Sequence, residues 1–343
     1  MNRNSHHLPS SRGRWWWLPN LALGLASLLL LASVAGNALR AVWRGAYPPP
    51  GQMVDVGGYR LHLHCMGQGE PSVIFEAAVT SPGLTWGLIQ PEVVKTTRAC
   101  VYDRAGLGWS DPSPRPRSVG NMAEELHLLL QAAGIPGPYV LVGYSSGGWQ
   151  ARYYAHAYQG DLAGMVMVDS AHEDQLQRLG AEGSPALEKV LPLIPALVKS
   201  GLPALAAPLL PVPGKNALDQ NSVRAYQGLL VTEDRFSETL AAEMAEVWDN
   251  MARVRAAQIR SFGDVPIIVL AHSGLAVIPG VNLSPEANQI WLELQAELAD
   301  LSSNGKLVIT EESGHDIHLE QPDLVIGAIL DVVQQARLIR ANK

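Results

Sequence analysis

The segment VLVGYSSGGWQ (Val140–Gln150) places two serines between glycines, directly after an apolar run. The run is typical of a buried strand and the residues after Gly148 of a helix, so the serines fall on a sharp strand-to-helix turn. In the pattern Gly-x-Ser-x-Gly, Ser145 occupies the tip of that turn, where an exposed hydroxyl can attack a carbonyl. The alternative is a helix N-cap, a position that serine often takes.

A serine hydroxyl is a good nucleophile only beside a base that an acid orients. His315 is the predicted base, because Gly314 frees the loop that brings it over the sheet after the last predicted strand. His318 is the fallback in the same loop. His172 is a rival base, since it lies just past the end of another strand.

Asp169 is the predicted acid, because it ends the strand GMVMVDS that follows the helix after Ser145. The order Ser145, Asp169, His315 is the chain order that accompanies a serine on this kind of turn. The strand that ends at Ala271 is followed by His272 and Ser273 and by no carboxylate. A turn or cap aspartate remains the alternative role for Asp169.

Short apolar runs alternating with helical patterns must position these residues. The strands are expected at 53–56, 60–65, 72–77, 99–102, 139–142, 165–169, 266–271 and 306–310. Helices are expected at 121–133, 149–158, 285–301 and 322–339. This order predicts an α/β fold with a mostly parallel eight-stranded sheet, helices on both faces and an antiparallel edge at its start. His62 and His64 alternate on a strand expected at that edge, where they would face solvent or cap the sheet.

The motifs GYSSGG, YDRAGLGWSD, MVMVDSAHE and SGHDIHLEQP together resemble the α/β-hydrolase superfamily, from about Met53 to Ile339. The resemblance implies acyl transfer by Ser145, His315 and Asp169, with the acid one strand earlier than is common in the family. Ala77-Ala78 take the places of the family's His-Gly, so the backbone N–H groups of Ser146 and Val79 would form the oxyanion hole. Asp103 and Arg104 would be structural.

The resemblance also implies what the enzyme acts on and what it does without. The expected substrate is a small acyl compound, an ester by default, and no cofactor or metal is implied. A helical cap is expected at about 171–262. A peptidase, an amidase, an acyltransferase and a catalytically inactive membrane-tethered binding protein are the alternatives.

The N-terminal segment predicts a separate element over residues 1–46. Its first residues carry Arg3, Arg12 and Arg14, and Leu21 to Gly36 is free of charge. This pattern predicts an uncleaved signal-anchor, with the hydrolase domain (47–343) outside the cytoplasm. A cleaved signal peptide, with small residues at Ser33–Ala35, and a hydrophobic helix of the main domain are the alternatives.

Cys65 and Cys100 are the only two cysteines. In the sheet of the family that this chain resembles, the strands that carry them are antiparallel neighbours, so the resemblance implies a disulfide. Two buried free thiols are the alternative. Disulfides persist in oxidising compartments, so the bridge and the export signal support each other. The net charge of −7 and the lack of a basic stripe argue against nucleic-acid binding.

Overall fold

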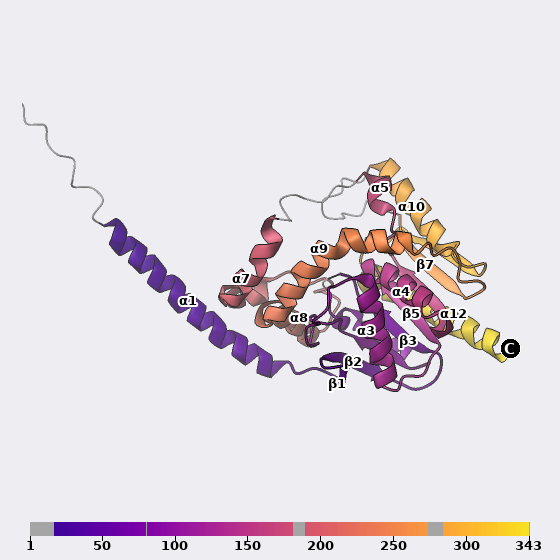
Figure 1. Cartoon of the computed structure of the whole chain (residues 1–343), viewed down its shortest axis with the longest axis horizontal. Helices are drawn as coiled ribbons and strands as arrows, with labels where there is room; N and C mark the ends of the chain where they lie inside the picture. Colours follow the sequence, from indigo (N-terminus) through magenta and orange to yellow (C-terminus); the bar gives the residue numbers. More distant parts are fainter. Residues whose placement is uncertain (1–16, 80, 181–188, 274–283, 343) are drawn as a thin grey trace, which may run out of the picture.

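The computed structural model describes residues 17–79, 81–180, 189–273 and 284–342. An eight-stranded sheet of order β1-β2-β4-β3-β5-β6-β7-β8 forms its centre (Figure 1). The strands are β1 (Gln52–Asp55), β2 (Arg60–Met66), β3 (Ser72–Glu76), β4 (Ala99–Tyr102), β5 (Tyr139–Tyr144), β6 (Leu162–Val168), β7 (Ile267–His272) and β8 (Gly305–Thr310). Each predicted strand is present, with ends that differ by a few residues.

The sheet is mixed. β2 runs antiparallel to both of its neighbours, and all other adjacent strands are parallel. Ser145, Asp169 and Ser273 each follow a parallel strand directly. Because β5, β6 and β7 are parallel neighbours, these three residues lie side by side along the edge formed by the carboxyl ends of the strands. That edge is where ligands bind in open parallel sheets.

Successive side chains of the central strands enter two different cores. Leu141 of β5 packs toward α3 (Val119–Ala132) and α4 (Ser146–Ala157), whereas Val140 and Val142 pack toward α12 (Pro322–Ala341). This alternation follows from the two-residue period of a strand, and it explains why strands buried on both faces read as continuous apolar runs. The remaining elements around the sheet are η1 (Gly83–Trp86), α2 (Gln90–Val93), η2 (Gln159–Asp161), α10 (Pro285–Ala299) and α11 (Ile317–Glu320).

A group of helices lies between β6 and β7, where the sequence predicts the cap. It comprises α5 (Gln175–Leu179), η3 (Leu191–Leu193), α7 (Ile194–Lys199), η4 (Leu202–Leu209), α8 (Gln220–Thr232) and α9 (Asp234–Ala256). Prolines keep the segments before α8 short, because proline lacks the N–H that a helix interior needs. The longest helix of this group is α9, which crosses above α3 and α4 (Figure 1).

The N-terminal apolar stretch forms one long helix, α1 (Leu18–Ala46), that projects from the body (Figure 1). By length and composition this helix could cross a membrane. Its C-terminal half is not free, however, because it contacts η4 and α8. Gly36 and Arg40 are buried there.

A disulfide joins Cys65 of β2 to Cys100 of β4, as expected. The two residues are directly opposite in the antiparallel register of these strands. The bridge lies at the amino end of β4, so it is remote from the edge of the sheet that carries Ser145.

Candidate active site

Ser145 lies at the tip of the turn between β5 and α4, in a strained backbone conformation. Its φ and ψ are 53° and −122°, a region that residues with side chains seldom occupy. The surrounding structure holds this conformation, because the Ser145 N–H donates to Val168 O and the Ser145 carbonyl accepts from Gly148 and Ala171. Ser145 is not an N-cap by side chain, since its hydroxyl accepts no hydrogen bond from the first turn of α4.

The flanking glycines allow the turn to form. A Cβ on Gly143 would lie 2.6 Å from the carbonyl oxygen of Gly147, and a Cβ on Gly147 would lie 2.4 Å from that of Glu76. Both distances are shorter than real carbon–oxygen contacts, and the atoms in the way are backbone. The glycines therefore let α4 start directly against β5 and β3.

The structure brings together Ser145, His315 and Asp169 from three separate loops. His315 Nε2 lies 3.1 Å from Ser145 Oγ, and His315 Nδ1 lies 2.5 Å from Asp169 Oδ2. Asp169 is fully buried, whereas the His315 side chain is 31% exposed. The arrangement can remove a proton from the serine hydroxyl and stabilise the resulting imidazolium.

Both ionisable partners of this group have shifted pKa values. Burial opposes the imidazolium, but the hydrogen bond and the charge of Asp169 outweigh it and raise the pKa of His315 above 6.5. Burial would also raise the pKa of Asp169, but hydrogen bonds from His272 and His315 outweigh it and lower that pKa below 3.8. Asp169 is therefore a carboxylate at neutral pH.

His272 is a residue of the site that the sequence reasoning missed. Its Nδ1 lies 2.7 Å from Asp169 Oδ1, and the indole N–H of Trp291 donates to the same oxygen at 3.2 Å. His272 Nδ1 also lies 2.8 Å from Oδ2, the oxygen that contacts His315, so two histidines bind this one carboxylate. The available signal was the position of His272 at the end of β7, which is the strand next to β6.

The loop after β3 (residues 77–79) runs beside the start of α4. The Val79 N–H donates to Ser146 Oγ at 2.5 Å, so the two residues expected to form the oxyanion hole are in contact. The guanidinium of Arg104 binds the carbonyl oxygens of Ala77 and Ala78, both at 2.8 Å. Arg104 is buried and also pairs with Glu243 of α9, 2.9 Å away.

Buried hydrogen bonds hold the segment YDRAGLGWSD in place. Asp103 accepts hydrogen bonds from the backbone N–H groups of Gly83 and Trp109, and it pairs with His62 Nδ1 at 2.8 Å. The prediction that His62 lies on an edge strand, where it faces solvent or caps the sheet, is wrong. β1 is the outer strand, and His62 of β2 is buried against Asp103 and the Pro50 carbonyl. Burial opposes the charged ring, but Asp103 outweighs it and raises the pKa of His62.

Neither of the other candidate bases lies beside Ser145. His318 is buried against Trp86 and Tyr144, and burial lowers its pKa to about 3, so it stays neutral. His172 is buried near the start of α5, where its Nδ1 accepts a hydrogen bond from the Asp174 N–H. Of these histidines, His315 alone contacts the serine within the described part of the chain.

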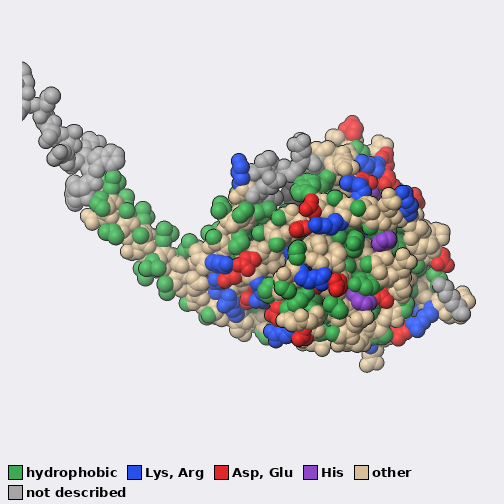
Figure 2. Space-filling view, viewed as in Figure 1, with side chains coloured by type: hydrophobic (Ala, Val, Ile, Leu, Met, Phe, Trp, Pro, Cys, Tyr) green, Lys and Arg blue, Asp and Glu red, His purple; other side chains and the backbone are tan. Residues whose placement is uncertain are grey.

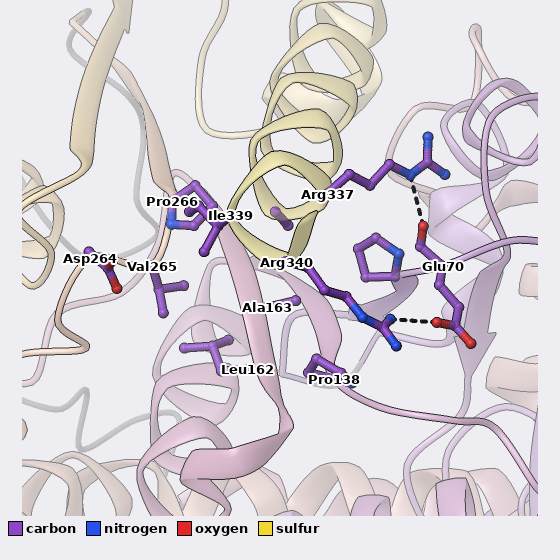
Figure 3. A pocket seen from close by; sticks show the side chains of 12 residues that line it. Glu70, Pro138, Leu162, Ala163, Asp264, Val265, Pro266, Arg337, Ile339 and Arg340 are labelled. Carbon is purple, nitrogen blue, oxygen red and sulfur yellow. Dashed lines mark hydrogen bonds and ion pairs between the residues drawn. The ribbon is translucent and has the colours of Figure 1, made fainter. Parts of the chain in front are cut away.

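A pocket of about 250 Å³ lies at the opposite end of the sheet (Figure 3). It is lined by residues that precede the parallel strands, among them Pro71, Pro138 and Pro266. Arg337 and Arg340 extend across it to the backbone and the carboxylate of Glu70 (Figure 3). Because it lies at the amino ends of the strands, this pocket is not the site that Ser145 serves.

The comparisons agree with this fold. The model of the alpha/beta hydrolase family matches residues 61–328, so the chain belongs to that family. The uncharacterized protein YqjL of Bacillus subtilis is 24% identical over 278 residues, covering 81% of this chain and 89% of that protein. An esterase structure from Thermogutta terrifontis has a TM-score of 0.58 at 21% identity, covering 83% of this chain and 98% of that one.

Other curated relatives are much longer than the region that matches. The "Probable transporter efuK" of Hormonema carpetanum is 33% identical over 149 residues, 41% of this chain and 21% of that protein. The chain thus spans less than a third of the length of the first curated relatives that it matches.

Proposed function

We propose that this protein is a serine hydrolase that cleaves a carboxylic ester through an acyl-enzyme. The observation that carries the proposal is the pair of contacts of His315, with Ser145 Oγ at 3.1 Å and Asp169 Oδ2 at 2.5 Å. Each distance suits proton transfer or orientation of the ring. Family membership alone leaves the nucleophile open, so the proposal depends on these side chains.

In the proposed mechanism, Ser145 Oγ attacks the ester carbonyl while His315 Nε2 takes its proton. Asp169 holds the ring through Nδ1 and stabilises the imidazolium. His315 then protonates the departing alcohol, and water attacks the acyl-enzyme in the same way. No cofactor takes part in these steps.

The N–H groups of Ser146 and Val79 are the proposed oxyanion donors. Ser146 begins α4, and the first N–H groups of a helix have no acceptor within the helix. The Val79 N–H donates to the Ser146 hydroxyl, so it becomes available when that hydroxyl rotates away. Losing one such donor typically costs about 3 kcal/mol of barrier.

We propose further that α1 is an uncleaved membrane anchor and that the hydrolase domain lies outside the cytoplasm. The length and apolar composition of α1 support the anchor, and the Cys65–Cys100 disulfide supports an oxidising compartment. A cleaved signal peptide is less consistent with the contacts of α1, because Ser33 and Asn37 donate hydrogen bonds to the carbonyl of Ser200.

The test is active-site labelling of the full-length protein with a fluorophosphonate, followed by peptide mapping. We expect the label on Ser145, no label and no ester hydrolysis in Ser145→Ala, and retained labelling in Ser146→Ala. Labelling of Ser146, or full activity of Ser145→Ala, would overturn the assignment. Product analysis with esters, amides and added alcohol separates an esterase from an amidase, a peptidase or an acyltransferase, and an inactive binding protein would give no product.

A further inference from the structure

The end of α1 is fastened to the cap by a stripe of residues at helical spacing. Ser33 and Asn37 donate to the carbonyl oxygen of Ser200. Gly36 approaches Gly201 so closely that a Cβ would lie 2.1 Å from the carbonyl oxygen of Gly201. Positions 33, 36, 37 and 40 share one helix face, so this face is dedicated to the cap.

The next turn of α1 fixes its angle to the body through charged and aromatic side chains. Arg40 binds the Thr232 carbonyl at the end of α8 and pairs with Asp234. Arg44 pairs with Glu233 at 3.1 Å. The ring of Trp43 covers Gly228, where a Cβ would lie 2.7 Å from it. The cap and α1 therefore form one unit rather than two parts joined by a free linker.

The cap exposes an apolar surface beside this junction. Five large apolar side chains are exposed here, in η3, α7 and η4 and at the residue just before η3. The exposed fraction of Leu209 reaches 83%. We call them the cap patch: Val190, Leu193, Leu197, Leu205 and Leu209. Figure 2 shows hydrophobic side chains along the projecting helix and again on the adjoining side of the body. Contiguous exposed apolar patches mark surfaces that meet a membrane or another protein.

The length of α1 favours the membrane. The part that projects beyond the cap contacts, Leu18 to Ala32, is roughly 22 Å long at the usual rise per residue. The hydrocarbon layer of a bilayer is about 30 Å thick, so the projecting part is too short to span it alone. The uncharged part, Leu18 to Leu39, is roughly 33 Å long and does match. The hydrocarbon layer must therefore extend past Ser33 and Gly36 and reach the level at which α1 meets Ser200 and Gly201, just before η4.

We propose that the cap patch is a membrane-contact surface that lies in the outer boundary of the same bilayer that α1 spans. The inference depends on the proposed membrane anchor and deepens it, because it places one face of the cap against lipid. The groove at the base of α1 is consistent with headgroup contact, since it is lined by Trp43 and Tyr47 together with Lys215 and Arg224. Aromatic rings and basic groups are the side chains that favour this zone.

The test uses the full-length protein in phosphatidylcholine vesicles that carry nitroxide groups on the acyl chains. A single added cysteine bears a fluorophore at Leu197 in the cap patch, at Leu25 in α1, or at Leu338 on α12. Leu338 is the matched control, because it is 57% exposed against 54% for Leu197, and α12 ends on the far side of the body from α1 (Figure 1). Fluorophosphonate labelling at Ser145 checks that each variant is folded.

We expect the nitroxides to quench Leu197→Cys and Leu25→Cys several-fold more than Leu338→Cys. Quenching at Leu25 with Leu197 behaving like Leu338 would overturn the inference and leave the anchor in place. A blue-shifted but unquenched label at Leu197 would mean that a second copy covers the patch, which also overturns it. No quenching at Leu25 would overturn both the anchor and the inference, whereas the hydrolase proposal is tested separately by its activity.

Discussion

Asp169 Oδ1 lies 2.7 Å from His272 Nδ1, while Oδ2 of the same carboxylate lies 2.5 Å from His315 Nδ1. The backbone of Asp169 has a positive φ of 43°, as does Ser145 at 53°. Two histidines therefore contact one buried carboxylate. Both Ser145 and Asp169 have a strained backbone conformation. Strain of this kind persists only where the surroundings fix it, and it is common at functional sites.

Asp169→Asn tests the acid. The amide keeps the volume of the side chain but leaves His315 with the wrong tautomer, so we expect kcat to fall by ~10⁴-fold. Asp174→Asn is the control, because Asp174 pairs with Arg255 near the cap and does not touch His315. If Asp169→Asn kept a near-normal rate and Asp174→Asn lost most of its activity, the catalytic acid would be Asp174, next to the start of α5, and not Asp169.

His272→Leu tests the second histidine as a positioning residue. A lost hydrogen bond to a charged group is worth about 1.5–3 kcal/mol, so kcat should fall by about 10- to 100-fold with KM unchanged. His272→Asn can place an N–H donor near the position of Nδ1, and it should recover part of the loss. Equal rates in wild type and His272→Leu would show that the Trp291 indole and the backbone N–H of residue 272 suffice to hold Asp169.

The pH dependence of kcat/KM reports the state of His315. His315 must be neutral to act as a base, and its pKa is raised above 6.5. We therefore expect kcat/KM to be low at acidic pH and to rise with pH, reaching half of its maximum at a pH above 6.5. Asp169→Asn removes the main cause of the raised pKa, so the midpoint of its residual activity should move to lower pH. A wild-type midpoint below 6.5 would contradict the assignment of His315.

The disulfide should support stability and not catalysis. The bridge closes a loop with a sequence separation of 35 residues. Replacing both cysteines by alanine should lower the free energy of unfolding by about 2–4 kcal/mol, measured by denaturant titration. The rate of ester hydrolysis by this double variant, measured at a temperature where it is folded, should stay unchanged. The bridge lies at the end of the sheet that is remote from Ser145. If protein purified from its native membrane without reducing agent had two thiols that react with an alkylating reagent, the bridge would be refuted.

The sequence predicts the strands and the Ser145 turn well because both are local signals. Buried parallel strands are short apolar runs, and the turn needs glycines at fixed positions around the serine. His62 was misplaced because its burial depends on β1 and on Asp103, which follows β4. The contacts of His272 with Asp169 and of Gly36 with Gly201 join segments far apart in the chain, and no spacing pattern encodes them.

The helix α9 connects α1 to the loop after β3. Its first residue, Asp234, pairs with Arg40 of α1, and Glu243 of the same helix pairs with Arg104, which holds the carbonyls of Ala77 and Ala78. The two acids are separated by roughly 14 Å of continuous helix. The helix α1 and the proposed oxyanion loop therefore pair with the start and the middle of one continuous helix. A chain shortened by residues 1–46 would lose the Arg40–Asp234 pair at the start of α9, so solubility gained by removing α1 would come with a less well-fixed oxyanion loop.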